Sequence, residues 1–126
     1  MPDVIGTIMT NEEANETYGE VQSSVSMSSS QLSSLSGQTK NLMMFKIIED
    51  RLYILGDSRA VLYPSGGSVD SSEVFAVYSK SKVLELLQMG ENSTTFIEKR
   101  KEVYSLTNGQ YTLEIANWCP PYCGQQ

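Results

Sequence analysis

The stretch EVYSLTNGQYTLEI, residues 102–115, decides the fold. Apolar and polar residues alternate on both sides of Asn108-Gly109, which is typical of a β-hairpin closed by a two-residue type I′ turn. A turn centred on this dipeptide places Leu106 opposite Tyr111. Because side chains alternate between the two faces of a sheet, one face is then apolar and the other polar. The apolar face carries Tyr104, Leu106, Tyr111 and Leu113, and the polar face carries Ser105, Thr107, Gln110, Thr112 and Glu114.

Similar signals precede this hairpin. Apolar runs at residues 42–48 and 52–55 are separated by Glu49-Asp50-Arg51, which predicts a second tight hairpin. Shorter strands are expected at residues 60–63, 74–78 and 94–97. Strand follows strand with short turns between them, so the sheet is expected to be mostly antiparallel.

One segment has a helical period. Ser79 or Ser81 is a suitable N-cap and Gly90 a suitable end, and the apolar residues between them fall on one side of a helix. These residues are Val83, Leu84, Leu86 and Leu87. The predicted fold is α+β, a single domain with a mostly antiparallel sheet of five to seven strands and one main helix on one face.

The first 40 residues differ in composition from the rest. They carry five acids and no base before Lys40, and nine of the fourteen residues at 23–36 are Ser. Thr10 with Glu13 predicts a capping box for a short helix at residues 11–18. We interpret residues 1–40 as an acidic, Ser-rich arm that packs on or flanks a core domain at residues 41–126. The alternatives are an irregular arm and a segment that orders only on a partner.

The charge balance disfavours two classes of partner. The chain of 126 residues has a net charge of −6, and its one dense basic run, Lys99-Arg100-Lys101, is bracketed by acids. This run is interpreted as a solvated strand face, so no nucleic acid and no anionic membrane partner is expected. The N-terminus lacks the pattern of a secretory signal, and no segment has the apolar length of a membrane helix. A cytoplasmic location is the default expectation.

Gly56-Asp57-Ser58 follows an apolar strand and resembles the nucleophile block of GDSL-type hydrolases. Its continuation through residue 62 resembles a hairpin of metal-dependent protein phosphatases. The first resemblance implies a His that activates the serine, and the chain contains no His. The second implies metal-binding aspartates in an Asp-Gly-His-Gly motif, and no Asp here precedes a Gly. The stretch is therefore predicted to be a structural turn.

The absence of His also excludes His-assisted acid–base catalysis and His-containing metal sites. The remaining carboxylates occur as adjacent acids in loops, a pattern that is more typical of solvated side chains than of a catalytic pair. We therefore expect a protein that is not an enzyme and that has no cofactor and no metal.

The C-terminus, NWCPPYCGQQ, contains both cysteines. Trp118-Cys119-Pro120-Pro121 resembles the opening of the redox site of tryparedoxins, but three residues separate the cysteines here instead of two. Cys119 and Cys123 form a possible disulfide or thiol pair. Three interpretations stay open: a small disulfide loop, two free thiols, or half of an intermolecular four-thiolate metal site.

The leading functional hypothesis is a non-enzymatic protein-interaction module. The sheet contains more tyrosine than a core of this size should absorb, and tyrosine is favoured at interfaces. The alternative for each tyrosine is a place at the edge of the core with its hydroxyl at the surface. Other hypotheses are a structural subunit of a homo-oligomeric assembly and a thiol-based redox or metal-binding protein. The predicted interaction surface consists of Tyr53, Tyr63, Tyr104 and Tyr111.

Overall fold

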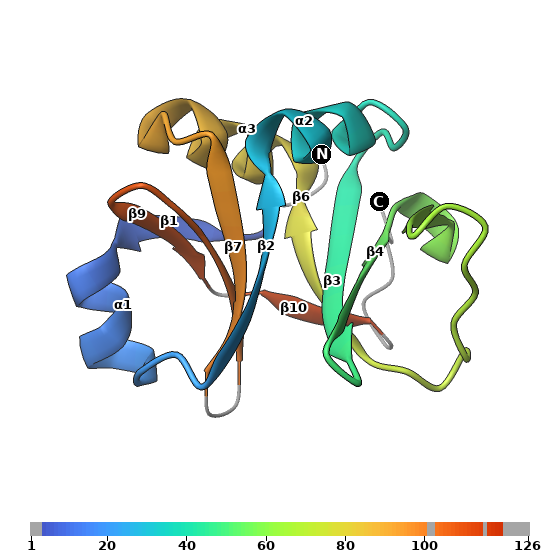
Figure 1. The fold of residues 1–126 in the computed structure, drawn as a ribbon, viewed down its shortest axis with the longest axis horizontal. Coiled ribbons are helices and arrows are strands. Elements are labelled where there is room, and N and C mark those ends of the chain that lie inside the picture. The colour runs from blue at the N-terminus through green and yellow to red at the C-terminus, as the bar shows by residue number, and fades with distance from the viewer. Residues whose placement is uncertain (1–3, 101–102, 115, 120–126) are drawn as a thin grey trace.

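The computed structural model describes residues 4–100, 103–114 and 116–119, with the backbone alone at 117–119. Within these ranges the strands form two five-stranded antiparallel sheets (Figure 1). Sheet 1 contains, in spatial order, β1 (Thr7–Thr10), β9 (Tyr111–Glu114), β8 (Tyr104–Asn108), β7 (Thr94–Lys99) and β2 (Ser23–Ser28). Sheet 2 contains β10 (Asn117–Cys119), β6 (Phe75–Ser79), β3 (Leu42–Ile48), β4 (Arg51–Leu55) and β5 (Val61–Tyr63). The helices are α1 (Asn11–Tyr18), α2 (Ser29–Ser36), α3 (Lys80–Gly90) and the short 3₁₀ helix η1 (Asp57–Arg59).

The α+β class, the antiparallel pairing and one main helix packed on the sheet are confirmed. The strands are divided between two sheets, however, instead of being gathered in one. The reason is visible in β3, which is apolar on both faces: Met43 and Phe45 belong to the larger core cluster, whereas Leu42 and Met44 belong to a second one. A strand buried on both sides needs a layer on each face. The larger cluster also takes residues from both sheets, α2 and α3.

The β8–β9 hairpin has the predicted faces but a different turn. Leu106 lies opposite Leu113, and Asn108 opposite Tyr111, so Gly109 and Gln110 form the turn. Gly109 has a φ of 60° at the first central position, where type II′ turns place glycine. The predicted pairing of Leu106 with Tyr111 was wrong. The faces survive because the pairing is displaced by two residues, and side-chain direction repeats every two residues.

The physical reason for the displaced turn is the side chain of Asn108, which is fully buried. Its amide donates to Ser29 Oγ at 2.9 Å and to the Asn92 carbonyl at 3.0 Å. Its Oδ1 accepts from the Asn92 N–H at 2.9 Å. These bonds tie the end of β8 to the loop after α3, so this asparagine serves as a brace and not as a turn residue.

The N-terminal segment is regular rather than irregular. The capping box of α1 forms as predicted, with Glu13 N–H donating to Thr10 Oγ1 and Thr10 N–H donating to Glu13 Oε1. Strands β1 and β2 are hydrogen-bonded at the two opposite ends of sheet 1. Residues 7–36 thus supply both outer strands of that sheet. Within the described ranges, no helix combines the length and the apolar character that a membrane crossing requires.

Candidate functional site

Among the described residues, strand β2 pairs with β7 on one side only, and its other side is an edge of sheet 1. The Ser29 N–H donates to the Ser93 carbonyl at 2.8 Å, in the same register as the β2–β7 ladder. Bonded and non-bonded pairs alternate along an antiparallel ladder, so the odd-numbered residues of β2 bond to β7. The backbone N–H and C=O groups of Ser24 and Ser26 therefore point away from β7, to the free edge.

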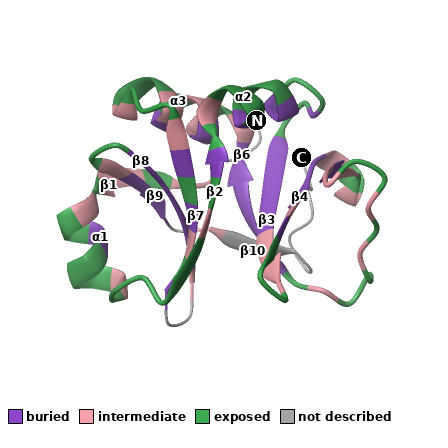
Figure 2. Ribbon diagram, in the orientation of Figure 1, coloured by how far each residue is buried: buried purple, intermediate pink, exposed green. Residues whose placement is uncertain are grey.

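This edge lacks the features that usually block strand addition. Natural edge strands are commonly protected by charged side chains, by proline or by a bulge. The six residues of β2 read SSVSMS, with neither a charge nor a proline, and each pairs in turn with one residue of β7. Figure 2 shows β2 largely exposed, whereas β3 and β6 of the facing sheet are mostly buried.

A groove of about 300 Å³ runs beside this edge. One wall is β2, and the other comes from sheet 2, at the turn between β3 and β4 and at the end of β5. Apolar side chains from both walls face it, and two opposite charges accompany them. The lining residues are Val25, Ser26 and Met27 on one side and Asp50, Arg51, Leu52, Tyr63 and Pro64 on the other. We call this feature the β2 groove.

The outer face of the same strand is also open. Ser26 lies opposite Phe96 on β7, and Ser24 lies opposite Glu98. The side chain of Phe96 is 41% exposed, which is unusual for a phenylalanine on a sheet. Because the serines beside it are small, the Phe96 ring can be reached from the free edge of β2.

The four predicted interface tyrosines do not form one surface. Tyr63 lines the β2 groove, and Tyr111 lines two shallow hollows beside the β8–β9 turn. Tyr53 packs against the second core cluster, on the other face of sheet 2. Tyr104 is 8% exposed, and its hydroxyl donates to the Ile47 carbonyl at 3.3 Å. The structure therefore brings only Tyr63 to the candidate site.

Of the cysteine pair, Cys123 lies outside the described residues. The backbone of Cys119 belongs to β10, where it lies opposite Phe75 of β6. The possible disulfide, thiol or metal role of Cys119 and Cys123 stays a prediction.

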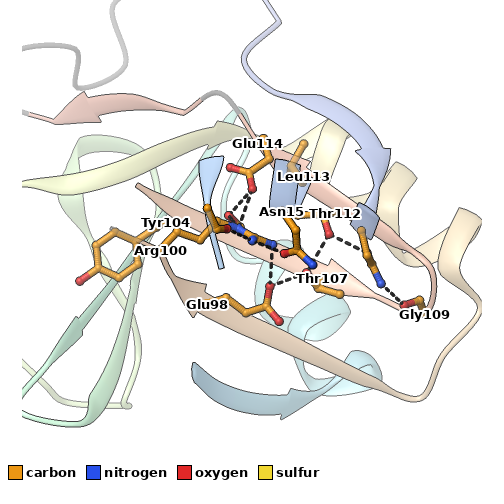
Figure 3. A network of polar contacts seen from close by, with 12 residues as sticks. Asn15, Glu98, Arg100, Tyr104, Thr107, Gly109, Thr112, Leu113 and Glu114 are labelled. Atoms are coloured by element: carbon orange, nitrogen blue, oxygen red, sulfur yellow. Dashed lines mark hydrogen bonds and ion pairs between the residues drawn. The ribbon is translucent and has the colours of Figure 1, made fainter. Parts of the chain in front are cut away.

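A second polar constellation lies on the outer face of sheet 1, beneath α1 (Figure 3). Its centre is Arg100, whose side chain is 2% exposed. The guanidinium donates to Asn15 Oδ1 and to the Gly19 carbonyl, each at 2.5 Å, and Nε lies 3.0 Å from Glu114 Oε2. Ser105 Oγ accepts from Arg100 Nε at 3.0 Å. Arg100 thus ties the end of α1 to strands β8 and β9.

The prediction of a solvated strand face for residues 99–101 was wrong at Arg100. Only Lys99 of the described residues in that run is exposed. The reason is the N-terminal segment: α1 packs over this part of the sheet and supplies oxygen acceptors for a charge that β7 and β8 alone would leave in water. The interaction joins residues more than 80 positions apart, so no local pattern indicates it.

The carboxylate of Glu114 is fully buried, and burial raises its pKa above 4.5. The hydrogen bond from Ser105 and the charge of Arg100 oppose this rise, whereas Glu98 adds to it. Glu98 Oε1 lies 3.5 Å from Arg100, so two carboxylates share one guanidinium. Among the side-chain oxygen and nitrogen atoms of the described residues, Glu114 Oε1 is the one that is buried and has no hydrogen-bond partner.

This constellation is suited to holding α1 on the sheet. Further bonds reinforce the attachment: Thr112 Oγ1 donates to Asn11 Oδ1 at 2.6 Å, and Asn11 Nδ2 donates to the Gly109 carbonyl at 3.0 Å. Arg100 and Glu114 are both covered, so neither can contact a substrate. The covered carboxyl also contributes, after burial itself, to raising the pKa of the buried Tyr78 hydroxyl.

The Gly56-Asp57-Ser58 stretch is a turn, as predicted. The Asp57 carboxylate accepts backbone N–H bonds from Lys40, Asn41 and Leu42 at 3.2, 3.1 and 2.9 Å. Ser58 has a φ of 58°, in the left-handed region. The aspartate therefore holds the start of β3 in place, and both of its carboxylate oxygens are engaged by backbone N–H groups.

No group of three or more His, Cys, Asp or Glu side chains that could hold a metal occurs within the described ranges. No protein-family model matches the chain, and neither a curated protein nor a solved structure is significantly similar to it. Function is therefore inferred from the geometry of the β2 groove and of the buried network around Arg100.

Proposed function

We propose that this protein is a non-enzymatic protein-interaction module that receives an extended segment of a partner at the β2 groove. The observation that carries the proposal is the free edge of β2, where Ser24 and Ser26 offer unpaired backbone groups beside an apolar groove. A sheet edge of this kind is completed by an added strand, which supplies main-chain hydrogen bonds and places alternate side chains in adjacent pockets.

The rest of the molecule supports this role. The other wall of the groove belongs to sheet 2, whose strands β3 and β4 are anchored in the core between the sheets. The groove is therefore already formed before a partner arrives, which lowers the entropic cost of binding. The buried charged pair Arg100 and Glu114, in contrast, belongs to the network that holds α1, and neither residue lines the groove.

The test is a selection of displayed random peptides of about ten residues, a length close to that of a long strand, on the intact, immobilised chain. We expect peptides that bind the parent chain and lose roughly tenfold or more in affinity on the Ser26→Pro variant, which lacks the edge N–H. The matched control is Ser26→Thr, which keeps that N–H and should bind as the parent does. Failure to enrich any peptide contradicts the proposed function.

Self-association through the same edge is the competing outcome. Two copies could pair their β2 edges about a two-fold axis and build a continuous sheet. Native mass spectrometry of the untagged chain distinguishes the two: a dimer that Ser26→Pro converts to a monomer identifies a homo-oligomeric subunit. A parent chain that stays monomeric and binds peptides supports the module.

A further inference from the structure

The β2 groove constrains the chemistry of its occupant on both faces. Val25 and Met27 point from β2 toward the larger core cluster and also line the groove. A strand added at this edge would place every second side chain on the same face, against Leu52, Tyr63 and Pro64 of the other wall. The side chains of Val25, Met27, Leu52 and Pro64 offer no hydrogen-bond partner, so a polar side chain packed against them would lose water without compensation. The inward side chains of the occupant are therefore apolar.

The opposite face calls for a different kind of residue. The outward side chains of an added strand would lie next to Ser24 and Ser26, and beyond Ser26 lies the exposed ring of Phe96. A long cationic side chain can cross a serine and stack on an aromatic face. The net charge of −6 attracts the same kind of partner at longer range.

We infer that the occupant of the β2 groove is an extended segment of another protein in which apolar residues alternate with lysine or arginine; this rests on the proposed function. The free backbone groups of β2 select the extended conformation, the groove selects apolar residues at every second position, and the exposed ring of Phe96 selects cationic residues between them. A second copy of this chain does not fit this description, since its own β2 carries serine in place of cationic residues.

The test uses the synthetic peptide Lys-Val-Arg-Val-Lys-Val-Arg with the intact chain, and affinity is measured by fluorescence anisotropy. Block-ordered Val-Val-Val-Lys-Arg-Lys-Arg has the same composition without alternation and should bind at least about tenfold more weakly. Two further peptides are N-methylated, one at every valine and the other at every cationic residue. Only alternate N–H groups of an added strand face β2, so one methylated peptide should lose binding and the other should keep it. Equal sensitivity of the two overturns the inference.

The residues of the protein are tested in parallel. Phe96→Ala should weaken the alternating peptide by roughly threefold to tenfold. Met89→Ala is the matched control, because Met89 is 40% exposed on α3 and does not line the β2 groove. Equal effects of these two variants count against the cationic contact at Phe96.

Hydrogen exchange with the displayed peptides separates this inference from the proposed function. In the complex, the amides of Ser24 and Ser26 should become protected. If the displayed peptides protect these amides but lack the alternation of apolar and cationic residues, the proposed function stands and the inference about the occupant is wrong. If they bind but protect other amides, the β2 groove is not the site and both are wrong. If neither the displayed library nor the synthetic peptide binds, both are wrong.

Discussion

The outer face of sheet 1 has two halves that both carry small polar residues in the sequence. Over β8 and β9, the polar side chains Ser105, Thr107, Thr112 and Glu114 are all buried under α1. Over β2 and β7, the side chains of Ser24, Ser26 and Phe96 are exposed. We call these the covered half and the open half. Apart from Phe96, the outward residues of both halves are small or polar, yet one half is a closed network and the other is a free surface.

The difference between the two halves indicates which part of the sheet is available to a partner. In the covered half each polar side chain is engaged with the sheet or with α1, as in the bond from Thr107 Oγ1 to Glu98 Oε1 at 2.6 Å, and only Glu114 keeps one oxygen, Oε1, without a partner among the described residues. In the open half the side chains of Ser24, Ser26 and Phe96 contact solvent, and no described strand pairs with the outer edge of β2. Buried polar groups of the first kind stabilise one arrangement of the chain, whereas open edges of the second kind are available to a partner.

The largest expected effect comes from breaking the covered half at its centre. Arg100→Met removes the cation from between Glu98 and Glu114 and leaves Asn15 and the Gly19 carbonyl without their donor. Breaking one partner of a buried ion pair typically costs about 3–5 kcal/mol. Urea denaturation should show a loss of this size in the free energy of unfolding.

Lys99→Met is the control, because Lys99 adjoins Arg100 in sequence and is exposed. Its effect should stay within about 0.5 kcal/mol. The double variant Arg100→Met, Glu114→Gln should recover part of the loss, since it no longer leaves a buried carboxylate without a cation. Equal losses for the Arg100 and Lys99 variants contradict the assignment of Arg100 as the brace of α1.

An intermediate effect should separate the two halves directly. Thr112→Val deletes a hydroxyl that donates to Asn11 Oδ1 and contacts Thr107 Oγ1 at 3.0 Å, so it should cost about 1–3 kcal/mol. Ser26→Ala deletes a hydroxyl in the open half and should change stability by less than about 0.5 kcal/mol. Thermal and urea unfolding of both variants check the difference. Similar losses in the free energy of unfolding for Thr112→Val and Ser26→Ala would mean that Ser26 is also covered in solution and that the open half is not a free surface.

Much of the fold could be predicted from local patterns. The α1 capping box, the turn between β3 and β4, and the apolar side of α3 each depend on residues close in sequence, and each is present. The faces of the β8–β9 hairpin could also be predicted, because they depend only on a two-residue period. Its exact pairing could not, because Asn108 is held by Ser29 and by Asn92, which lie outside the hairpin.

The candidate site was harder to predict for the same reason. The sequence SSVSMS does not indicate which side of the strand lacks a neighbour. That depends on the pairing of β2 with β7 and on the absence, among the described residues, of a strand beyond β2. Tyr63 was a candidate from the sequence and lines the β2 groove, but its neighbours there come from β2 and from the turn at Asp50, and no local pattern indicates them. Arg100 was missed because its acceptors lie on α1. The basic run Lys99-Arg100-Lys101 does not by itself indicate that its middle residue is buried.

The smallest expected effect concerns the pH dependence of the covered half. The pKa of Glu114 in the folded protein lies above its value of 4.5 in an unfolded chain, mainly because of burial. Above pH 4.5 the folded chain therefore holds a proton that the unfolded chain has already released. The contribution of Glu114 to stability is then fully present below pH 4.5 and is lost as the pH rises through the folded pKa.

Glu114→Gln cannot titrate, so the free energy of unfolding of the parent minus that of the variant should fall as the pH rises above 4.5. Urea denaturation of both proteins at a series of pH values measures this difference. A difference that rises with pH at Glu114 would mean that Arg100 and Ser105 outweigh burial, and the covered half would then be an ion pair stabilised in its charged form.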